Sequence, residues 1–280
     1  MPSPTYRDLR AFGLEFVTPE NLEFPALLWQ IQNRPNPLGP QAVMDNNSAA
    51  AILVNQSGKA VIALAHVWKY TEAGGHVRTS RCSNLGSSMQ MDVLAGRTEV
   101  TRDRFSFILP GSKRLITEDG MFGDNFDVLP PESGPVRGSI VGSGGGGHLR
   151  AGEKEIVAIE LYLDVAIFED GLCVGPDEFG LFQSVTEGLQ QQRGTAQEIV
   201  ETLRRGESVG RVFEILRPLA SHTPPAPATR RARHPARTLS MFASTAIHHL
   251  IDMTDSDVMA WFEQAAQPPR ISLHRPSEDR

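Results

Sequence analysis

The residues best suited to chemistry form a polar row, Glu160, Tyr162 and Asp164, at alternate positions of an apolar stretch. A pair of carboxylates can act as general acid and base when both reach the same substrate. On an extended chain, residues four positions apart are separated by roughly 13 Å, which is too far for easy cooperation. We therefore expect this row to be the solvated face of a strand.

Four acidic residues flank a predicted hairpin turn and could bind a calcium ion if their loops converge: Glu169, Asp170, Asp177 and Glu178. They lack the alternating ligands, the central glycine and the terminal glutamate of an EF-hand. Turn formation by Asp170 and helix capping by Asp177 explain two of them without a metal. No metal site is predicted at this hairpin.

The histidines offer two further candidates. His248 and Asp252 are four positions apart on a predicted helix and could face one metal ion, but two ligands do not complete a site. His66 lies on an apolar strand face, where we expect a hydrogen-bonded core histidine and not a catalytic base. The motifs Ser-x-x-Lys and His-Glu-x-x-His are absent. No catalytic, cofactor-binding or metal-binding residue is assigned.

Two segments have the composition of ligand-binding loops. The run Gly142–Gly147 lacks the Lys and Ser or Thr of a P-loop, so a flexible connection is expected. A short basic tract could contact phosphates but is broken by proline and lacks interleaved aromatics. Its members are Arg230, Arg231, Arg233, His234 and Arg237. A solvated linker is expected there, with no nucleic-acid or membrane partner.

One stretch of alternating aliphatic residues predicts a single long strand with one apolar face. These residues are Val157, Ile159, Leu161, Leu163, Val165 and Ile167. Asp170 and Gly171 then favour a two-residue hairpin turn, in which Ile167 faces Val174. Further short strands are predicted at 51–54, 60–70, 76–82, 90–94, 104–109, 114–117 and 126–129. Many short strands with frequent turn signals favour an antiparallel sandwich.

After the sandwich, helical spacing predicts helices over about 182–203, 209–216, 239–253 and 258–265. Asp177 is expected to cap the first of them. The predicted fold class is α+β, an antiparallel immunoglobulin-like β-sandwich followed by C-terminal helices. Its parts are an extended Pro-rich arm at 1–45 that docks through Trp29 and neighbouring residues, the sandwich at 46–177, a helical region at 178–220, a linker at 221–237 and a helical pair with a tail at 238–280.

Composition narrows the function classes. The chain has 280 residues, 40% of them hydrophobic, with a net charge of -6, which gives no general attraction to nucleic acid or anionic lipid. Cys82 and Cys173 lack partners at zinc-ligand spacing, so a zinc module is excluded and one disulfide stays possible. No secretory signal and no apolar run of roughly 18–20 residues is visible, so a soluble cytoplasmic protein is expected.

Two passages carry a resemblance to known proteins. Ile52–Val61 resembles the opening hairpin of bacterial immunoglobulin-like sandwiches, in which an Asn or Ser turn joins two early strands. Phe168–Gly171, together with Gly175–Asp177, resembles uncharacterised bacterial proteins of similar layout. The antibody-type order of Cys, Trp and Cys is not kept, because Trp68 precedes both cysteines. The resemblance implies a sandwich and carries over no active residues.

Two functions follow as expectations. The first is a non-enzymatic interaction or scaffold protein that contacts another protein through sheet edges, the Trp29 arm or the C-terminal helices. The alternative is a hydrolase-like enzyme in which Glu160, Asp164, His66, His148 and the acidic hairpin meet in a cleft. Substrate, partner and oligomeric state are left open.

Overall fold

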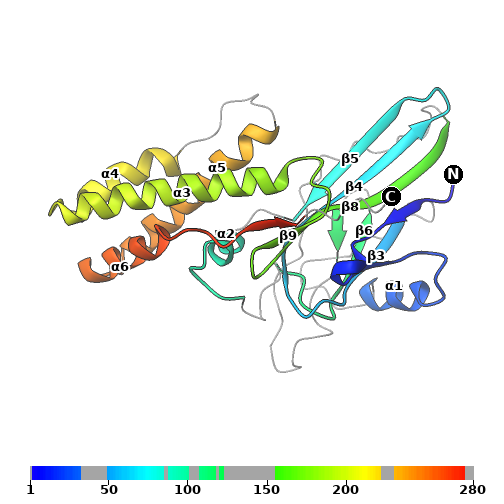
Figure 1. Cartoon of the computed structure of the whole chain (residues 1–280), viewed down its shortest axis with the longest axis horizontal. Coiled ribbons are helices and arrows are strands. Elements are labelled where there is room, and N and C mark those ends of the chain that lie inside the picture. Colours follow the sequence, from blue (N-terminus) through cyan, green and yellow to red (C-terminus); the bar gives the residue numbers. More distant parts are fainter. Residues whose placement is uncertain are drawn as a thin grey trace. The chain divides into compact units, whose positions relative to one another are not determined.

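A computed structural model describes most of the chain, in which two compact units can be distinguished. The described residues are 2–32, 49–84, 88–100, 107–117, 120–122, 155–221 and 230–274. Unit 1 comprises residues 1–85, 100–178 and 274–280, and unit 2 comprises 86–99 and 179–273. The strands β1–β9 belong to unit 1 and the helices α2–α6 to unit 2 (Figure 1). Unit 2 is discontinuous, because its first segment is inserted between two strands of unit 1.

The larger sheet, sheet A, has the order β10-β9-β8-β4-β5, with β1 also paired to β8. Its strands are β1 (Thr5–Arg7), β4 (Val61–Glu72), β5 (Val77–Ser83), β8 (Ile156–Phe168), β9 (Leu172–Val174) and β10 (Ser272–His274). The β1–β8 pair is parallel, so the prediction of a purely antiparallel fold is wrong. Only strands joined by tight turns must run antiparallel, and β1 is far from β8 in the chain. The mixture of sheets and helices agrees with the coarser prediction.

The smaller sheet, sheet B, is antiparallel and has the order β2-β3-β6-β7. Its strands are β2 (Leu14–Val17), β3 (Ala50–Asn55), β6 (Lys113–Thr117) and β7 (Gly120–Phe122), and the short helix η1 (Arg10–Phe12) precedes β2. Buried side chains of both sheets form one apolar cluster, with Trp68 and Leu161 from sheet A and Leu53 and Ile116 from sheet B. The core of unit 1 therefore lies between its two sheets.

The predicted long strand is confirmed as β8, but it contains a bulge. Ala65 pairs with Val165 and the next residue, His66, pairs with Leu163, so Asp164 has no direct cross-strand neighbour. After the bulge, the side chains of β8 point to the opposite faces of sheet A from those that strict alternation predicts. The core between the sheets takes Ala166 and Phe168, and not the expected Val165 and Ile167. Val157, also expected on the apolar face, is 48% exposed.

The turn after β8 also differs from the prediction. Ile167 pairs with Cys173 and not with Val174, because the turn contains three residues, Glu169 to Gly171. Gly171 ends this turn with φ 81°, and its N–H donates to the Phe168 carbonyl at 2.9 Å. A three-residue turn of this kind needs a positive φ at its last position, which glycine adopts without strain.

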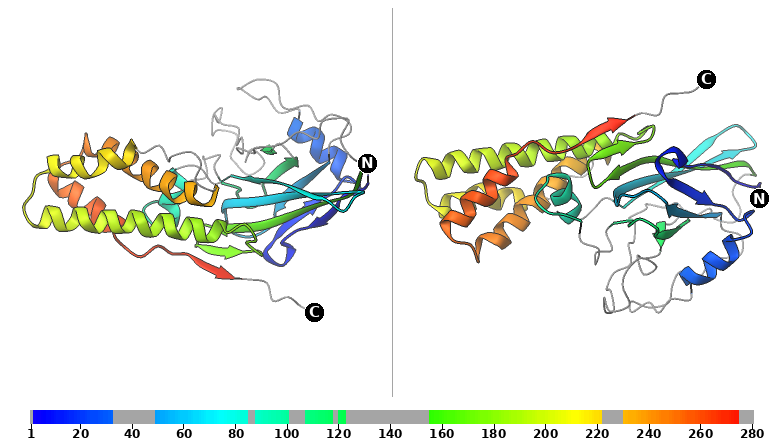
Figure 2. Two further views of the ribbon diagram at one scale, coloured as in Figure 1. Left: turned by 90° about the horizontal axis from the view of Figure 1, so that it is seen from above. Right: turned by 60° about the horizontal axis from the view of Figure 1, so that its bottom comes forward.

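The described part of unit 2 contains five helices, of which α3 and α5 lie side by side (Figure 2). They are α2 (Ser88–Leu94), α3 (Leu181–Arg204), α4 (Val209–Ala220), α5 (Arg230–Leu250) and α6 (Asp255–Ala265). Residues 90–94, predicted as a strand, belong to α2, since a short apolar run suits either structure until packing decides. The N-cap of α3 is Gly180, so Asp177 is not the cap, and α5 begins inside the predicted linker.

A buried arginine joins the inserted segment to the rest of unit 2. The Arg97 side chain is 5% exposed and lies 2.6 Å from the Asp92 carboxylate. It donates a hydrogen bond to Gln192 of α3 at 3.0 Å and stacks on Phe242 of α5, 5.2 Å from the ring centroid. Its charge is therefore both paired and covered by an aromatic face.

Candidate functional site

The predicted polar row lies on the face of sheet A opposite the inter-sheet core, where it is paired with basic residues. Glu160 lies 2.6 Å from Arg7 of β1 and 3.7 Å from Lys69 of β4. The Arg7 guanidinium carbon also lies 4.6 Å from the centre of the Tyr162 ring. Opposite charges therefore alternate across three strands, and the Glu160 carboxylate is held by two cations.

Part of this row is buried, which corrects the expectation of a solvated face. Tyr162 is 3% exposed and Asp164 is fully buried, while the Glu160 side chain is 25% exposed. The residues after β9 pack against the bulge of β8. The N–H groups of Asp177 and Glu178 donate to the carbonyl and the Oδ1 of Asp164, at 2.9 and 2.7 Å. Asp164 therefore acts as an acceptor for a backbone loop.

Gly175 makes this close approach possible. Its φ is 120°, and a Cβ atom at this position would lie 2.5 Å from the Asp164 carbonyl oxygen. Only glycine adopts such a backbone conformation readily. On the far side of the carboxylate, Arg81 Nη2 lies 4.0 Å from Asp164 Oδ2. The buried charge thus has a cation near one oxygen and a main-chain donor at the other.

Two further groups on this face are protonated at neutral pH. Tyr162 donates its hydroxyl to Glu178 Oε2 at 2.7 Å, and burial together with this hydrogen bond raises the pKa of Tyr162. Burial also raises the pKa of the Cys173 thiol, and the negative charges of Asp177 and Asp164 raise it further. A neutral phenol and a neutral thiol are poor nucleophiles.

The two cysteines do not form a disulfide. Cys82 on β5 pairs with His66, whose cross-strand neighbour Leu163 belongs to the inter-sheet core. Cys173 on β9 pairs with Ile167, which faces the other side of the sheet. β5 and β9 are separated by β4 and β8, so three strand spacings, roughly 14 Å, lie between the two backbones. A disulfide needs Cα atoms within about 7 Å.

His66 faces the core between the sheets, on the opposite side of sheet A from Glu160 and Tyr162. It is fully buried, and neither ring nitrogen has a hydrogen-bond partner of good geometry among the described residues. Burial lowers the pKa of His66 to about 4, although the nearby Thr117 main chain acts in the other direction. The predicted core position is confirmed and the predicted hydrogen bonding is not.

The sheet itself separates His66 from the carboxylates that the hydrolase-like alternative requires, and His148 lies outside the described residues.

The acidic residues Asp170 and Glu169 of the predicted hairpin contact a lysine side chain and main-chain N–H groups of the same chain. Asp170 lies 2.5 Å from Lys59 Nζ and accepts a hydrogen bond from the Leu172 N–H, while Glu169 accepts one from the Ala60 N–H at 3.0 Å. Burial acts to raise the pKa of Asp170, but the hydrogen bonds from Lys59 and Leu172 outweigh it and lower that pKa. Across the described ranges, no three His, Cys, Asp or Glu side chains are grouped to hold a metal ion.

The second predicted ligand pair is also not formed on a helix. α5 ends at Leu250, so Asp252 lies in the following turn and its N–H donates to the His249 carbonyl at 3.2 Å. The four-residue spacing from His248 therefore does not place both side chains on one helix face. The glycine run at 142–147 lies outside the described residues, and of the basic tract only the Arg237 side chain is described and exposed.

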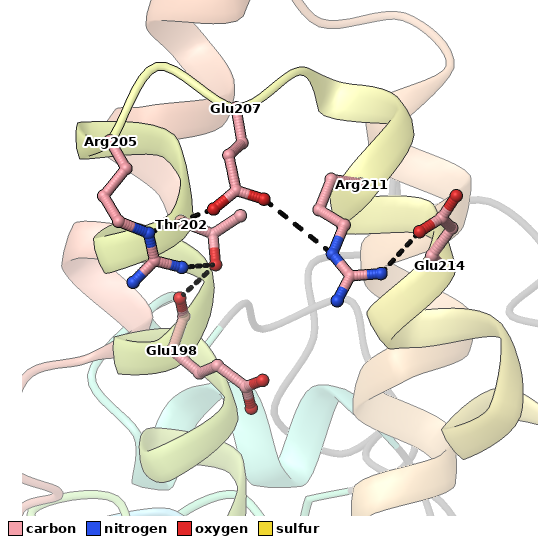
Figure 3. Close-up of polar contacts among 6 residues, drawn as sticks. All are labelled: Glu198, Thr202, Arg205, Glu207, Arg211 and Glu214. Atoms are coloured by element: carbon pink, nitrogen blue, oxygen red, sulfur yellow. Dashed lines mark hydrogen bonds and ion pairs between the residues drawn. The ribbon is translucent and has the colours of Figure 1, made fainter.

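An exposed ion-pair network closes the turn between α3 and α4 (Figure 3). Glu207 lies 3.0 Å from Arg205 and 3.8 Å from Arg211. Arg205 also donates to Thr202 at 3.2 Å, and Arg211 pairs with Glu214 at 2.5 Å. The charges satisfy one another in solvent, so the network fits a role in stabilising the turn.

The helix α1 (Phe24–Gln32) shows an exposed apolar surface around Trp29, in the arm that the sequence analysis named as one possible contact region. Phe24 and Ile31, two neighbours of Trp29, are buried against sheet B with Ile52, so the predicted docking involves these neighbours and not Trp29 itself. Phe24 and Ile31 are seven residues apart and share a helix face, while Trp29 is turned away from it. Trp29 is 65% exposed and Leu22, in the preceding turn, is 97% exposed.

Pro25 and Ala26 are also exposed and lie between Leu22 and Trp29 along the chain. The positions 22, 25, 26 and 29 follow helical spacing, and this pattern was the available sequence signal. We call the surface formed by Leu22, Pro25, Ala26 and Trp29 the outer face of α1.

Comparison with known proteins identifies no relative. No family model matches the chain, and searches of curated proteins and of solved structures give no match either. None of the described helices combines the length and apolar character needed to cross a membrane.

Proposed function

We propose that this chain is a non-enzymatic protein-interaction protein and that the outer face of α1 supplies a contact surface. The exposure of Trp29 carries the proposal, since it lies on a helix whose opposite face is already buried against sheet B. Tryptophan is enriched among the residues that dominate binding energy at protein interfaces. Leu22 enlarges the apolar surface at the beginning of the helix.

The arrangement of ionisable groups also supports a binding protein over a hydrolase. Glu160 is held by two cations, and Tyr162 is a protonated donor to Glu178. His66 lies on the other face of sheet A. A cytoplasmic location and an immunoglobulin-like arrangement of the sheets remain predictions attached to this proposal.

The test compares two variants of neighbouring exposed residues, Trp29→Ala and Gln30→Ala, in the tagged full-length chain. Proteins that copurify from the cell of origin are quantified by mass spectrometry. We expect at least one protein to be lost with Trp29→Ala and retained with Gln30→Ala. Because Trp29 is mostly exposed, its removal should leave the urea midpoint nearly unchanged, which separates lost binding from misfolding. Equal recovery of all proteins with both variants would contradict the proposal.

A further inference from the structure

We infer that the partner of α1 presents an apolar groove bordered by lysine or arginine side chains. This inference rests on the function proposed above and adds the chemistry of the partner. It starts from two glutamates, Glu20 and Glu23, which lie in the turn before α1 beside Leu22 and are exposed. The outer face of α1 is therefore an apolar surface with an acidic border.

The charges of these two glutamates are not compensated locally. Neither forms an ion pair within the described part of the chain, and the segment from 18 to 32 contains no Lys, Arg or His. Elsewhere in unit 1 the pattern is different. Glu15 lies 2.7 Å from Arg10, Glu160 lies 2.6 Å from Arg7, and Asp170 lies 2.5 Å from Lys59.

Charge complementarity then selects among possible partners. A basic border on the partner would pair with Glu20 and Glu23 while its groove covers Leu22 and Trp29. A second copy of this chain, docked by the same face, would place the glutamates of both copies together, and like charges at an interface oppose binding. Anionic lipid and nucleic acid would be repelled for the same reason.

The experiment first identifies the partner through this surface. A photoreactive benzophenone residue at position 26, which is exposed on the outer face, is introduced into the full-length chain in the cell of origin. The crosslinked protein is identified and the crosslinked peptide is mapped on it. We expect the peptide to lie in an apolar groove flanked by Lys or Arg.

The purified pair is then compared by titration calorimetry at low and high salt. We expect Trp29→Ala to weaken binding on the order of 30-fold. Glu23→Lys should weaken it by about tenfold at low salt and by less at high salt. Glu155→Lys is the matched control, because Glu155 is also exposed and the change in charge is the same. This control should bind like the original chain.

The outcomes separate the two proposals. If Trp29→Ala abolishes binding while Glu23→Lys and Glu155→Lys behave alike, the basic border is wrong and the interaction function stands. If Trp29→Ala binds with unchanged affinity, the proposed function itself fails at this surface. A crosslink between two copies of this chain, or binding to vesicles of anionic phospholipid, would also overturn the basic groove.

Discussion

A close approach between α3 and α5 gives the sharpest stability prediction. Gly188 of α3 faces Thr238 of α5, and a Cβ atom at Gly188 would lie 2.8 Å from Thr238 Cγ2 and 3.0 Å from its Cβ. Thr238 is 3% exposed, and its branched side chain cannot move away without disturbing the packing of α5. The substitution Gly188→Ala tests whether the two helices are as close as described.

The expected magnitude follows from two opposing effects. Alanine stabilises a helix interior by about 1 kcal/mol relative to glycine. Overpacking a filled contact costs about 1–3 kcal/mol. Gly188→Ala should therefore destabilise the protein by about 1 kcal/mol. Gly194 provides the control on the same helix, because a Cβ there would meet nothing within 4 Å, so Gly194→Ala should stabilise by about 1 kcal/mol.

Urea unfolding followed by circular dichroism at 222 nm measures both variants, with the denaturant slope as a check on the unfolded state. A double-mutant cycle with Thr238→Ser, which removes the nearest methyl group, should recover part of the loss in Gly188→Ala. Equal stabilisation by Gly188→Ala and Gly194→Ala would refute the close contact between α3 and α5.

Three further predictions concern buried groups. Because burial holds the pKa of His66 near 4 and the unfolded value is about 6.5, the unfolded chain takes up the proton first, so stability should fall by up to roughly 3 kcal/mol between pH 6.5 and 4. Unfolding at pH 7, 6 and 5 should show a flatter profile for His66→Leu, and parallel profiles would contradict this. Gly175→Ala should lower the free energy of unfolding by about 3 kcal/mol in the same assay. The control Gly75→Ala should lower it by about 1 kcal/mol, because Gly75 has a positive φ but open space around it. Equal losses of stability would count against the close approach of Gly175 to Asp164. Arg97→Ala should lower the free energy of unfolding by about 3 kcal/mol, because it leaves the Asp92 carboxylate without its partner. The control Arg211→Ala removes an exposed arginine and should leave the urea midpoint almost unchanged. A small loss of stability with Arg97→Ala would show that the pairing of Arg97 with α2 is weak.

Periodicity predicted the elements whose pattern is long and regular. The alternation from Val157 to Ile167 predicted β8 because an apolar face of that size suits only a strand packed on one side. The bulge at Asp164 could not be read from the same pattern, since the aliphatic alternation continues through it. Its position depends on donors from residues 177 and 178, which reach Asp164 only in the folded chain.

Short segments and caps were less predictable, because several local structures suit the same residues. The run at 90–94 fits a strand or a helix, and packing within the helical unit 2 favours the helix α2. Asp177 has good capping chemistry, yet α3 begins after Gly180 because Asp177 is held at the β8 bulge. The polar row of β8 was identified from sequence, but its pairing with Arg7 required the parallel strand β1.

The exposed surface of α1 was recognised from sequence only as an arm containing Trp29. The helix has apolar residues on two faces, and composition alone does not say which face reaches sheet B. Phe24 and Ile31 cover the sheet, while Trp29 on the other side of the helix is 65% exposed. In a helix with two apolar faces, either face can pack on the sheet, and the other is then exposed.

The interrupted sequence of unit 2 has a consequence for biosynthesis. The segment 86–99 leaves the ribosome well before α5, which contributes Phe242 to the stacking on Arg97. Roughly 145 residues must be added in between, and at bacterial or eukaryotic elongation rates this takes on the order of ten seconds. Within that interval α3, which supplies Gln192, is made before α5, so the packing around Arg97 is complete only once α5 has been synthesised.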